Sequence, residues 1–346
     1  MQNLKKLSKL DKLERQILLQ LPLSRLPLKR HNPLIEKAYA QLKKELSRKG
    51  IHFVPHIWIS SEWFCPDGIP GFAIPFYLYH PTLQKMEKEK IGVVEGANYS
   101  ELLKLMRHET GHAFENYYST RKHPLRRKVF GCSQTKPYPA SYKPVLYSTQ
   151  YVSHLGEGYA QSHPDEDFAE TFAAWLSMPK KVWSIKYRQK KVVLKKLEAI
   201  ENIVFEVKNR KQANKKNNKT FEIIDKDHRL LKDYYSEKLK RQKLSTSLET
   251  KKLIQSKGIL KNYVKNEKEI YRVLSRNRNK ILNELSHNLG LYKYQAKKLI
   301  KPLEKDFKLI NKTLLASEED IYQFILDTAV VEALESVRLK KDRVYL

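Results

Sequence analysis

Five consecutive residues, His108-Glu109-Thr110-Gly111-His112, have the types and spacing that metal chemistry needs. They read H-E-x-x-H within a segment whose pattern predicts a helix. On a helix, residues four apart lie on one face, so His108 and His112 can point at the same atom. Two neutral imidazoles so placed can share a Zn²⁺ ion, and Glu109 then lies close enough to act on a water at the metal. The motif predicts the core of a zinc-dependent peptide hydrolase.

The helix that must carry this motif is predicted to begin after Ser100, a suitable N-cap with an acid in the turn that follows. Apolar residues then recur near helical spacing and give the helix a buried face: Leu102, Leu105, Met106, Ala113 and Phe114. The alternative is a buried amphipathic helix in which the two histidines are ordinary polar residues.

A catalytic zinc site normally has three protein ligands and one open position, so one ligand must come from elsewhere. The acidic segment 162–176 is the obvious source, with a helix that could begin at Pro164. Glu166 and Glu170 lie one turn apart on a common face, and the pair offers both a ligand and a supporting carboxylate. Asp165 and Asp167 are expected only to interact favourably with the helix dipole.

The two segments together resemble the gluzincin group of metallopeptidases. H-E-T-G-H followed by E-D-F-A-E-T-F-A is similar to the active-site helices of the anthrax lethal factor peptidase domain. This resemblance implies that Glu166 is the third zinc ligand and that Glu170 supports the site. It also implies that the hydroxyl of Tyr159 lies near the zinc, where it would help to stabilise the oxyanion of the tetrahedral intermediate.

The chain also resembles a bacterial family of zinc-binding metallopeptidases. The resemblance rests on W-F-C-P-D-G-I-P-G (63–71), on the H-E-T-G-H helix, and on Y-A-Q-S-H-P-D-E-D-F-A-E-T-F-A (159–173). It is strongest from about residue 63 to residue 175 and fades into the Lys-rich C-terminal part. It implies an α+β, zincin-like fold with one zinc ion and leaves the substrate open.

Two strands are predicted before the metal helix, at 51–60 and 72–79, and Pro75 favours an edge position for the second. Since an edge strand can pair with an extended peptide, Phe72, Ala73 and Ile74 are the predicted substrate-binding strand. Residues 119–150 show little periodicity and are predicted to be a long loop between the two metal helices, forming a cleft wall or a lid.

The chain of 346 residues is predicted to have three parts. An N-terminal helical segment covers 1–50, and a zincin-like catalytic domain covers 51–180. A mainly α-helical, Lys-rich extension covers 181–346, with a polar linker near 209–219.

The net charge of +29 is uneven, because residues 1–180 carry +9 and residues 181–346 carry +20. Such a surface attracts nucleic acid, anionic lipid or acidic polypeptide, yet the lysines are spread and no nucleic-acid motif is present. The two cysteines, Cys65 and Cys132, form no disulfide framework. Without a secretory signal or an apolar run of membrane-spanning length, a cytoplasmic protein is expected.

The function predicted from these features is hydrolysis of a peptide or related amide bond through a metal-activated water. The alternative is a protein that binds nucleic acid or a protein partner and whose zinc site is structural or inactive. The intact Glu109 favours the enzyme, because a structural zinc site has no use for a general base. The sequence contains no sign of cleavage preference or oligomeric state.

Overall fold

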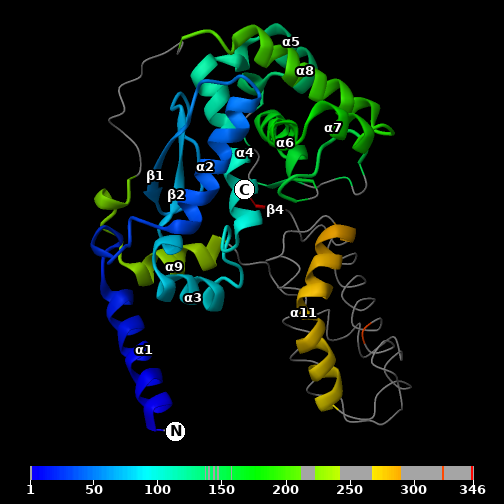
Figure 1. Ribbon diagram of the computed structural model, residues 1–346. Coiled ribbons are helices and arrows are strands. Elements are labelled where there is room, and N and C mark those ends of the chain that lie inside the picture. Colours follow the sequence, from blue (N-terminus) through cyan, green and yellow to red (C-terminus); the bar gives the residue numbers. More distant parts are fainter. Residues whose placement is uncertain are drawn as a thin grey trace. The chain divides into compact units, whose positions relative to one another are not determined.

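The computed structural model describes residues 2–136, 138, 141–142, 145, 148–156, 158–211, 223–241, 267–289, 322 and 344–345. The chain divides into two compact units (Figure 1). The first comprises Met1–Pro139, Ser148–Leu155 and Tyr159–Arg241, and the second comprises Ala140–Tyr147, Gly156–Gly158 and Gln242–Leu346.

The first unit is mostly helical with one small sheet, which is compatible with the predicted α+β class. Its helices and strands are α1 (Gln2–Gln20), α2 (Pro33–Arg48), β1 (His56–Ser60), β2 (Gly71–Pro75), α3 (Pro81–Lys90), α4 (Tyr99–Tyr118), α5 (Pro124–Phe130), α6 (Pro164–Ser177), α7 (Lys180–Lys186), α8 (Lys191–Val207) and α9 (Leu231–Arg241). No described helix is both long and apolar enough to cross a membrane.

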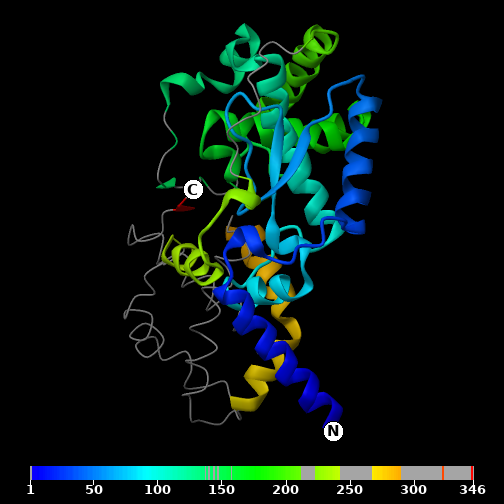
Figure 2. The ribbon, with the colours of Figure 1, turned by 90° about the vertical axis from the view of Figure 1, so that its left-hand side faces the viewer.

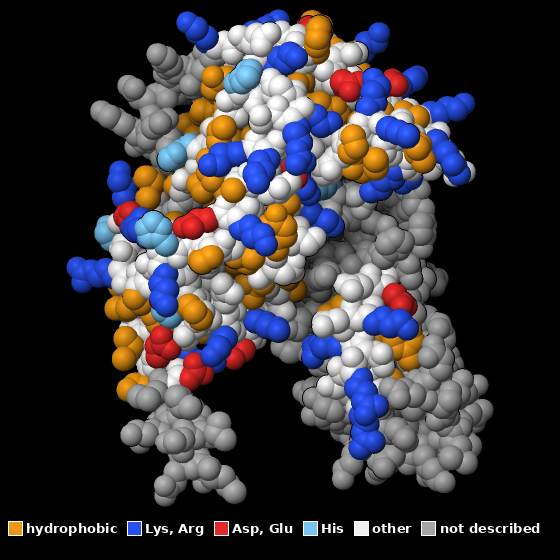
Figure 3. Space-filling model, viewed as in Figure 1, with side chains coloured by type: hydrophobic (Ala, Val, Ile, Leu, Met, Phe, Trp, Pro, Cys, Tyr) orange, Lys and Arg blue, Asp and Glu red, His pale blue; other side chains and the backbone are white. Residues whose placement is uncertain are grey.

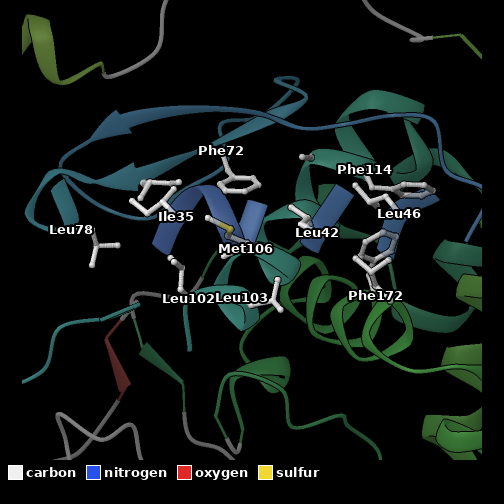
Figure 4. Close-up of a cluster of buried hydrophobic side chains, with 14 of the residues drawn as sticks. Ile35, Leu42, Leu46, Phe72, Leu78, Leu102, Leu103, Met106, Phe114 and Phe172 are labelled. Carbon is white, nitrogen blue, oxygen red and sulfur yellow. The ribbon is translucent and has the colours of Figure 1, made fainter. Parts of the chain in front are cut away.

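Helix α4, which carries the H-E-T-G-H motif, lies at the centre of this unit. It packs against α2 and α6, and β2 runs alongside it (Figures 1 and 2). The contacts are made by a continuous apolar core (Figure 4). Its members include Ile35, Leu42 and Leu46 of α2, Phe72 of β2, Leu102, Met106 and Phe114 of α4, and Phe172 of α6. The motif is therefore held from several sides by packed side chains.

The starts of the two metal-site helices are fixed by caps. Helix α4 begins at Tyr99, two residues earlier than predicted, because the side chain of Asn98 rather than that of Ser100 caps it by accepting from the Glu101 N–H (3.0 Å). Helix α6 begins at Pro164 as predicted, with its fixed φ suited to the first helical position. The Nδ1 atom of His163 caps α6 by accepting from the Asp165 N–H (3.2 Å).

The sheet differs from expectation. Strands β1 and β2 pair in parallel, with Trp58 opposite Ala73. On its other side, Ala73 donates its N–H to the carbonyl of Phe64 (2.8 Å). Phe72, Ala73 and Ile74 are all 0% exposed. The predicted substrate-binding strand thus lies in the core, with its backbone already paired at Ala73, and it offers no open edge there to a peptide.

The predicted loop at 119–150 contains ordered helical structure. Short 3₁₀ turns cover Thr120–Lys122 and Ser133–Thr135, and α5 lies between them. Helix α5 is only 7 residues long, so its apolar residues are too few to show a repeating pattern in the sequence. What stabilises it is tertiary contact with α6 and α8.

Helices α7, α8 and α9 belong to the first unit, so that unit continues to Arg241, beyond the boundary predicted at residue 180. Most of the predicted linker, from residue 212 to 219, lies outside the described residues. In the second unit the described elements are α11 (Glu267–Leu289) and a short antiparallel pair, β3 (Ser141–Tyr142) with β4 (Val344–Tyr345).

Candidate metal centre

Three side chains from α4 and α6 bring their donor atoms together. The Nε2 atoms of His108 and His112 lie 3.2 Å apart. The Oε2 atom of Glu166 lies 3.0 Å from Nε2 of His108 and 3.3 Å from Nε2 of His112. All three residues are buried, and within the described residues they are the group that could hold a metal ion.

The donor spacing fits zinc. Ligands on a tetrahedral zinc with bonds of about 2.0–2.1 Å lie about 3.3 Å from one another. Glu166 Oε2 is also buried without a hydrogen-bond donor of good geometry in the described part of the chain, although it faces both imidazoles. A buried carboxylate oxygen in this position is stabilised by a cation. The donor set His, His and Glu is one that zinc accepts with a fourth position open.

The charges of the site depend on one another. Burial lowers the pKa of His108, but the carboxylates of Glu166 and Glu170 outweigh it and raise that pKa to about 10. In turn, His112 and His108 hold the pKa of Glu166 well below its usual range, although burial opposes this. The two histidines and Glu166 together therefore favour a bound positive charge. Without a metal, that charge is a proton on the histidines. A divalent cation would displace that proton, so metal affinity should rise with pH.

Glu170 lies behind His108 rather than among the three donors. Its Oε1 atom is 2.9 Å from His108 Nδ1, and its Oε2 atom accepts from the backbone N–H groups of His154 (2.9 Å) and Leu155 (3.0 Å). A carboxylate on the far nitrogen of a ligating histidine fixes the ring's orientation and tautomer. Of the two acids that the sequence left as alternatives, Glu166 faces the histidine donors and Glu170 contacts the opposite side of the ring.

Gly111 sets the distance between the two helices. A methyl group on this residue would lie 2.8 Å from the Cα and 3.2 Å from the carbonyl oxygen of Ala169. Only glycine permits so close an approach of the helix backbones. Along α4 this contact lies between His108 and His112. Along α6 it lies between Glu166 and Glu170. The glycine in H-E-T-G-H is thus what allows a ligand on α6 to reach the histidines.

The carboxylate of Glu109 lies in the same buried region and, within the described residues, has no hydrogen-bond or ion-pair partner. The residue is 7% exposed. Burial raises its pKa, while the two neighbouring histidines oppose the rise. An unpaired carboxylate with a raised pKa is suited to accept a proton near neutral pH.

Two tyrosines lie against the candidate ligands. The ring of Tyr159 is 5.4 Å from that of His108, and burial together with Glu166 and Glu109 raises its pKa well above the usual range. Tyr138 donates its hydroxyl to Glu166 Oε1 (2.9 Å). The sequence pointed to Tyr159 only. Tyr138 lies in a Pro- and Tyr-rich stretch without periodicity, so nothing in its spacing distinguished it.

Asp165 and Asp167 do more than interact with the helix dipole. The guanidinium of Arg126, 0% exposed, donates to Glu115 Oε1 (2.8 Å) and pairs with Asp165. Asp167 pairs with Lys196 of α8 (2.7 Å). The expectation that these acids act only at the helix terminus was wrong, because their partners lie far away in sequence. The ion pairs tie α6 to α4, α5 and α8.

Asn116, one turn beyond His112, holds the loop at 65–69 against α4. Its Nδ2 atom donates to the carbonyls of Pro66 (2.9 Å) and Ile69 (2.7 Å), and its Oδ1 atom accepts from the Gly68 N–H (3.1 Å). Cys65, in the same loop, is close enough to Glu109 for that carboxylate to help raise its pKa, after burial. The W-F-C-P-D-G-I-P-G segment therefore lies beside the candidate base.

The histidines His123, His154 and His163 have structural partners. His123 Nε2 lies 2.9 Å from Glu206, and His163 caps α6 and contacts the Lys136 carbonyl (2.7 Å). His154 contacts the Lys104 carbonyl, and burial lowers its pKa to about 4. A neutral His154 adds no charge beside Glu170.

Comparison with known proteins identifies the family. None of the curated proteins and none of the solved structures matches the chain. A family model described as "Putative zinc-binding metallo-peptidase" matches residues 83–339, well over half of the sequence. The match contains both metal-site helices and extends through the C-terminal part, where the resemblance was expected to fade. The chain belongs to this family of zinc-binding metallo-peptidases.

Proposed function

We propose that this protein is a zinc-dependent hydrolase that cleaves a peptide or a related amide bond. His108, His112 and Glu166 would hold a single zinc ion. The observation that supports this most strongly is the mutual spacing of their donor atoms, 3.0, 3.2 and 3.3 Å, among buried side chains of α4 and α6. A zinc ion bound there would lower the pKa of a coordinated water and polarise the scissile carbonyl.

The remaining steps belong to side chains of this chain. Glu109 accepts the proton of the attacking water and later delivers it to the leaving amine, which its buried and uncommitted carboxylate suits. The Tyr159 hydroxyl, kept protonated by its raised pKa, donates to the oxyanion as the carbonyl becomes tetrahedral. Glu170 keeps the His108 ring oriented throughout.

The test combines metal analysis with a matched pair of proteins. Purified wild-type protein and Glu109→Gln should each contain about one zinc per chain, since Glu109 is not a ligand. Both are then incubated with a peptide library made from a denatured proteome, and new termini are counted. Peptides cut by the wild type and not by Glu109→Gln support the proposal. Absence of zinc from the wild type, or equal cleavage by both proteins, refutes it.

The alternative, a binding protein with a structural or inactive zinc site, finds less support. On the face shown in Figure 3, Lys and Arg side chains are scattered among acidic and apolar ones and are not gathered in one patch. An uncommitted buried acid beside the metal ligands also has no structural purpose. Salt-dependent binding to nucleic acid at physiological ionic strength, together with a Glu109→Gln variant that behaves as the wild type, would favour the alternative.

A further inference from the structure

We propose that Tyr138 is a positioning residue that keeps one oxygen of Glu166 away from the metal, so that Glu166 binds through a single atom. This inference rests on the proposed function. It assigns a role to a side chain outside the two metal-site helices and outside the H-E-x-x-H and E-D-F-A-E segments.

The two oxygens of Glu166 have different surroundings. Oε2 faces the Nε2 atoms of both histidines, at 3.0 and 3.3 Å. Oε1 accepts the Tyr138 hydroxyl at 2.9 Å. A hydrogen bond to Oε1 engages one of its lone pairs and restrains the rotation of the carboxylate about its axis. Glu166 is thereby presented to a cation through Oε2.

Binding through one oxygen matters for catalysis. A catalytic zinc needs an open fourth position for water, whereas a carboxylate that binds through both oxygens takes up an additional coordination position. Without the Tyr138 hydroxyl, the carboxylate of Glu166 can rotate and bring Oε1 to the metal. The phenol therefore protects the position that water must occupy.

Tyr138 is itself held in place by the start of α6. Its ring stacks on that of His163 with centroids 3.8 Å apart and planes inclined by 20°. His163 is fixed by the cap to Asp165 and by its contact with the Lys136 carbonyl. Since Tyr138 is still 51% exposed, it lies at the surface of the site and not in its core. Its removal should not empty a buried volume.

The test measures metal binding and coordination without measuring turnover. Wild type, Tyr138→Phe and the control Tyr151→Phe are compared. Tyr151 is a partly buried tyrosine whose ring lies against the Lys196 ammonium (4.0 Å to the ring centroid) and not at the metal ligands. Zinc affinity is measured by competition with a chromophoric chelator. The visible spectrum of the cobalt(II)-substituted protein reports coordination number, because four-coordinate cobalt absorbs more strongly than five- or six-coordinate cobalt.

Tyr138→Phe should bind zinc about 10–100-fold more weakly, as found when a partner of a metal ligand is removed. Its cobalt bands should be weaker than those of the wild type, and Tyr151→Phe should change neither quantity. His163→Asn, which replaces the capping Nδ1 atom with a capping oxygen and removes the ring that stacks on Tyr138, should give a smaller loss in the same direction.

Wild-type affinity and an unchanged cobalt spectrum in Tyr138→Phe would overturn the inference and leave the proposed function intact. Equal losses in Tyr138→Phe and Tyr151→Phe would also overturn it, since they would reflect general destabilisation. If the wild type binds neither metal, the proposed function fails and this inference fails with it. If Tyr138→Phe does not fold, the zinc affinity and cobalt spectrum of His163→Asn test the inference in its place.

Discussion

Replacing Gly111 with alanine should impair metal binding far more than folding. The new methyl group would lie 2.8 Å from Ala169 Cα, whereas ordinary contact begins at 3.4 Å, so α4 and α6 must separate by about 0.6 Å at this point. Forced overpacking of this kind costs about 1–3 kcal/mol. Replacing glycine within a helix regains about 1 kcal/mol. The free energy of unfolding of the metal-free protein should therefore fall by only about 0–2 kcal/mol.

The metal site tolerates a smaller displacement of the helices than the fold does. Zinc–ligand distances hold within about 0.2 Å, so a separation of about 0.6 Å between the helices exceeds what the donors can absorb without rearrangement. Because the histidines lie on α4 and Glu166 lies on α6, the separation acts directly on the set of ligands. We expect zinc affinity to fall by at least the 10–100-fold typical of a lost supporting contact.

Chelator competition measures the affinity, and urea unfolding in the presence of a chelator measures the stability of the metal-free protein. Lys104→Ala, an exposed substitution on the same helix, is the control and should change neither. Adding Ala169→Gly should restore little, because the nearest clash is with the Cα atom and not with the side chain. A Gly111→Ala protein that binds zinc as tightly as the wild type would refute the reasoning that this contact sets the ligand geometry.

Three further predictions concern the surroundings of the site. Glu170→Gln should weaken zinc binding about 10–100-fold in chelator competition, because the His108 ring loses its carboxylate partner; unchanged affinity would show that Glu170 has no role in orientation. Arg126→Met should lower the free energy of unfolding by up to about 3–5 kcal/mol, because Glu115 and Asp165 lose their fully buried partner and keep only Arg121; the exposed Lys128→Ala should change it by less than about 0.5 kcal/mol in the same urea titration. Burial raises the pKa of Glu95 to about 7 from an ordinary 4.5, although Lys238 opposes the shift. The stabilisation from its bound proton is thus complete below pH 4.5 and disappears as the pH rises to 7, so Glu95→Gln should be more stable than wild type by about 1–3 kcal/mol at about pH 8 and nearly equal to it at about pH 4. Equal differences at both pH values would contradict this assignment.

The helix pair and the acid–histidine set could be predicted from the sequence because they depend on local spacing. An i, i+4 pair of histidines shares a face in any α-helix, and Pro164 marks the start of α6 whatever surrounds it. The choice between Glu166 and Glu170 could not be made from spacing. Both lie on the face toward α4, and which of them meets the histidine donors depends on the axial offset of the two helices.

The remaining differences arise from tertiary contacts. β2 looked like an edge strand because Pro75 lacks an N–H, but Phe64 pairs with Ala73 from outside regular structure and helix packing buries the strand. The roles of Asp165 and Asp167 depend on Arg126 and Lys196, which lie 39 and 29 residues away. Single-sequence reasoning has no measure of such contacts.

The bonds of Asn116 to the loop at 65–69 imply a coupling in the dynamics of the protein. This loop has no regular secondary structure, so its amide hydrogens would ordinarily exchange with solvent quickly. The amide of Gly68, however, is held by a side chain of α4, the helix that carries the candidate ligands. For the loop to open, that bond must break, and both carbonyls bound to Asn116 must be released. The loop and the last turns of α4 therefore form one cooperative unit, in which the segment beside Glu109 remains ordered as long as the metal-site helix does.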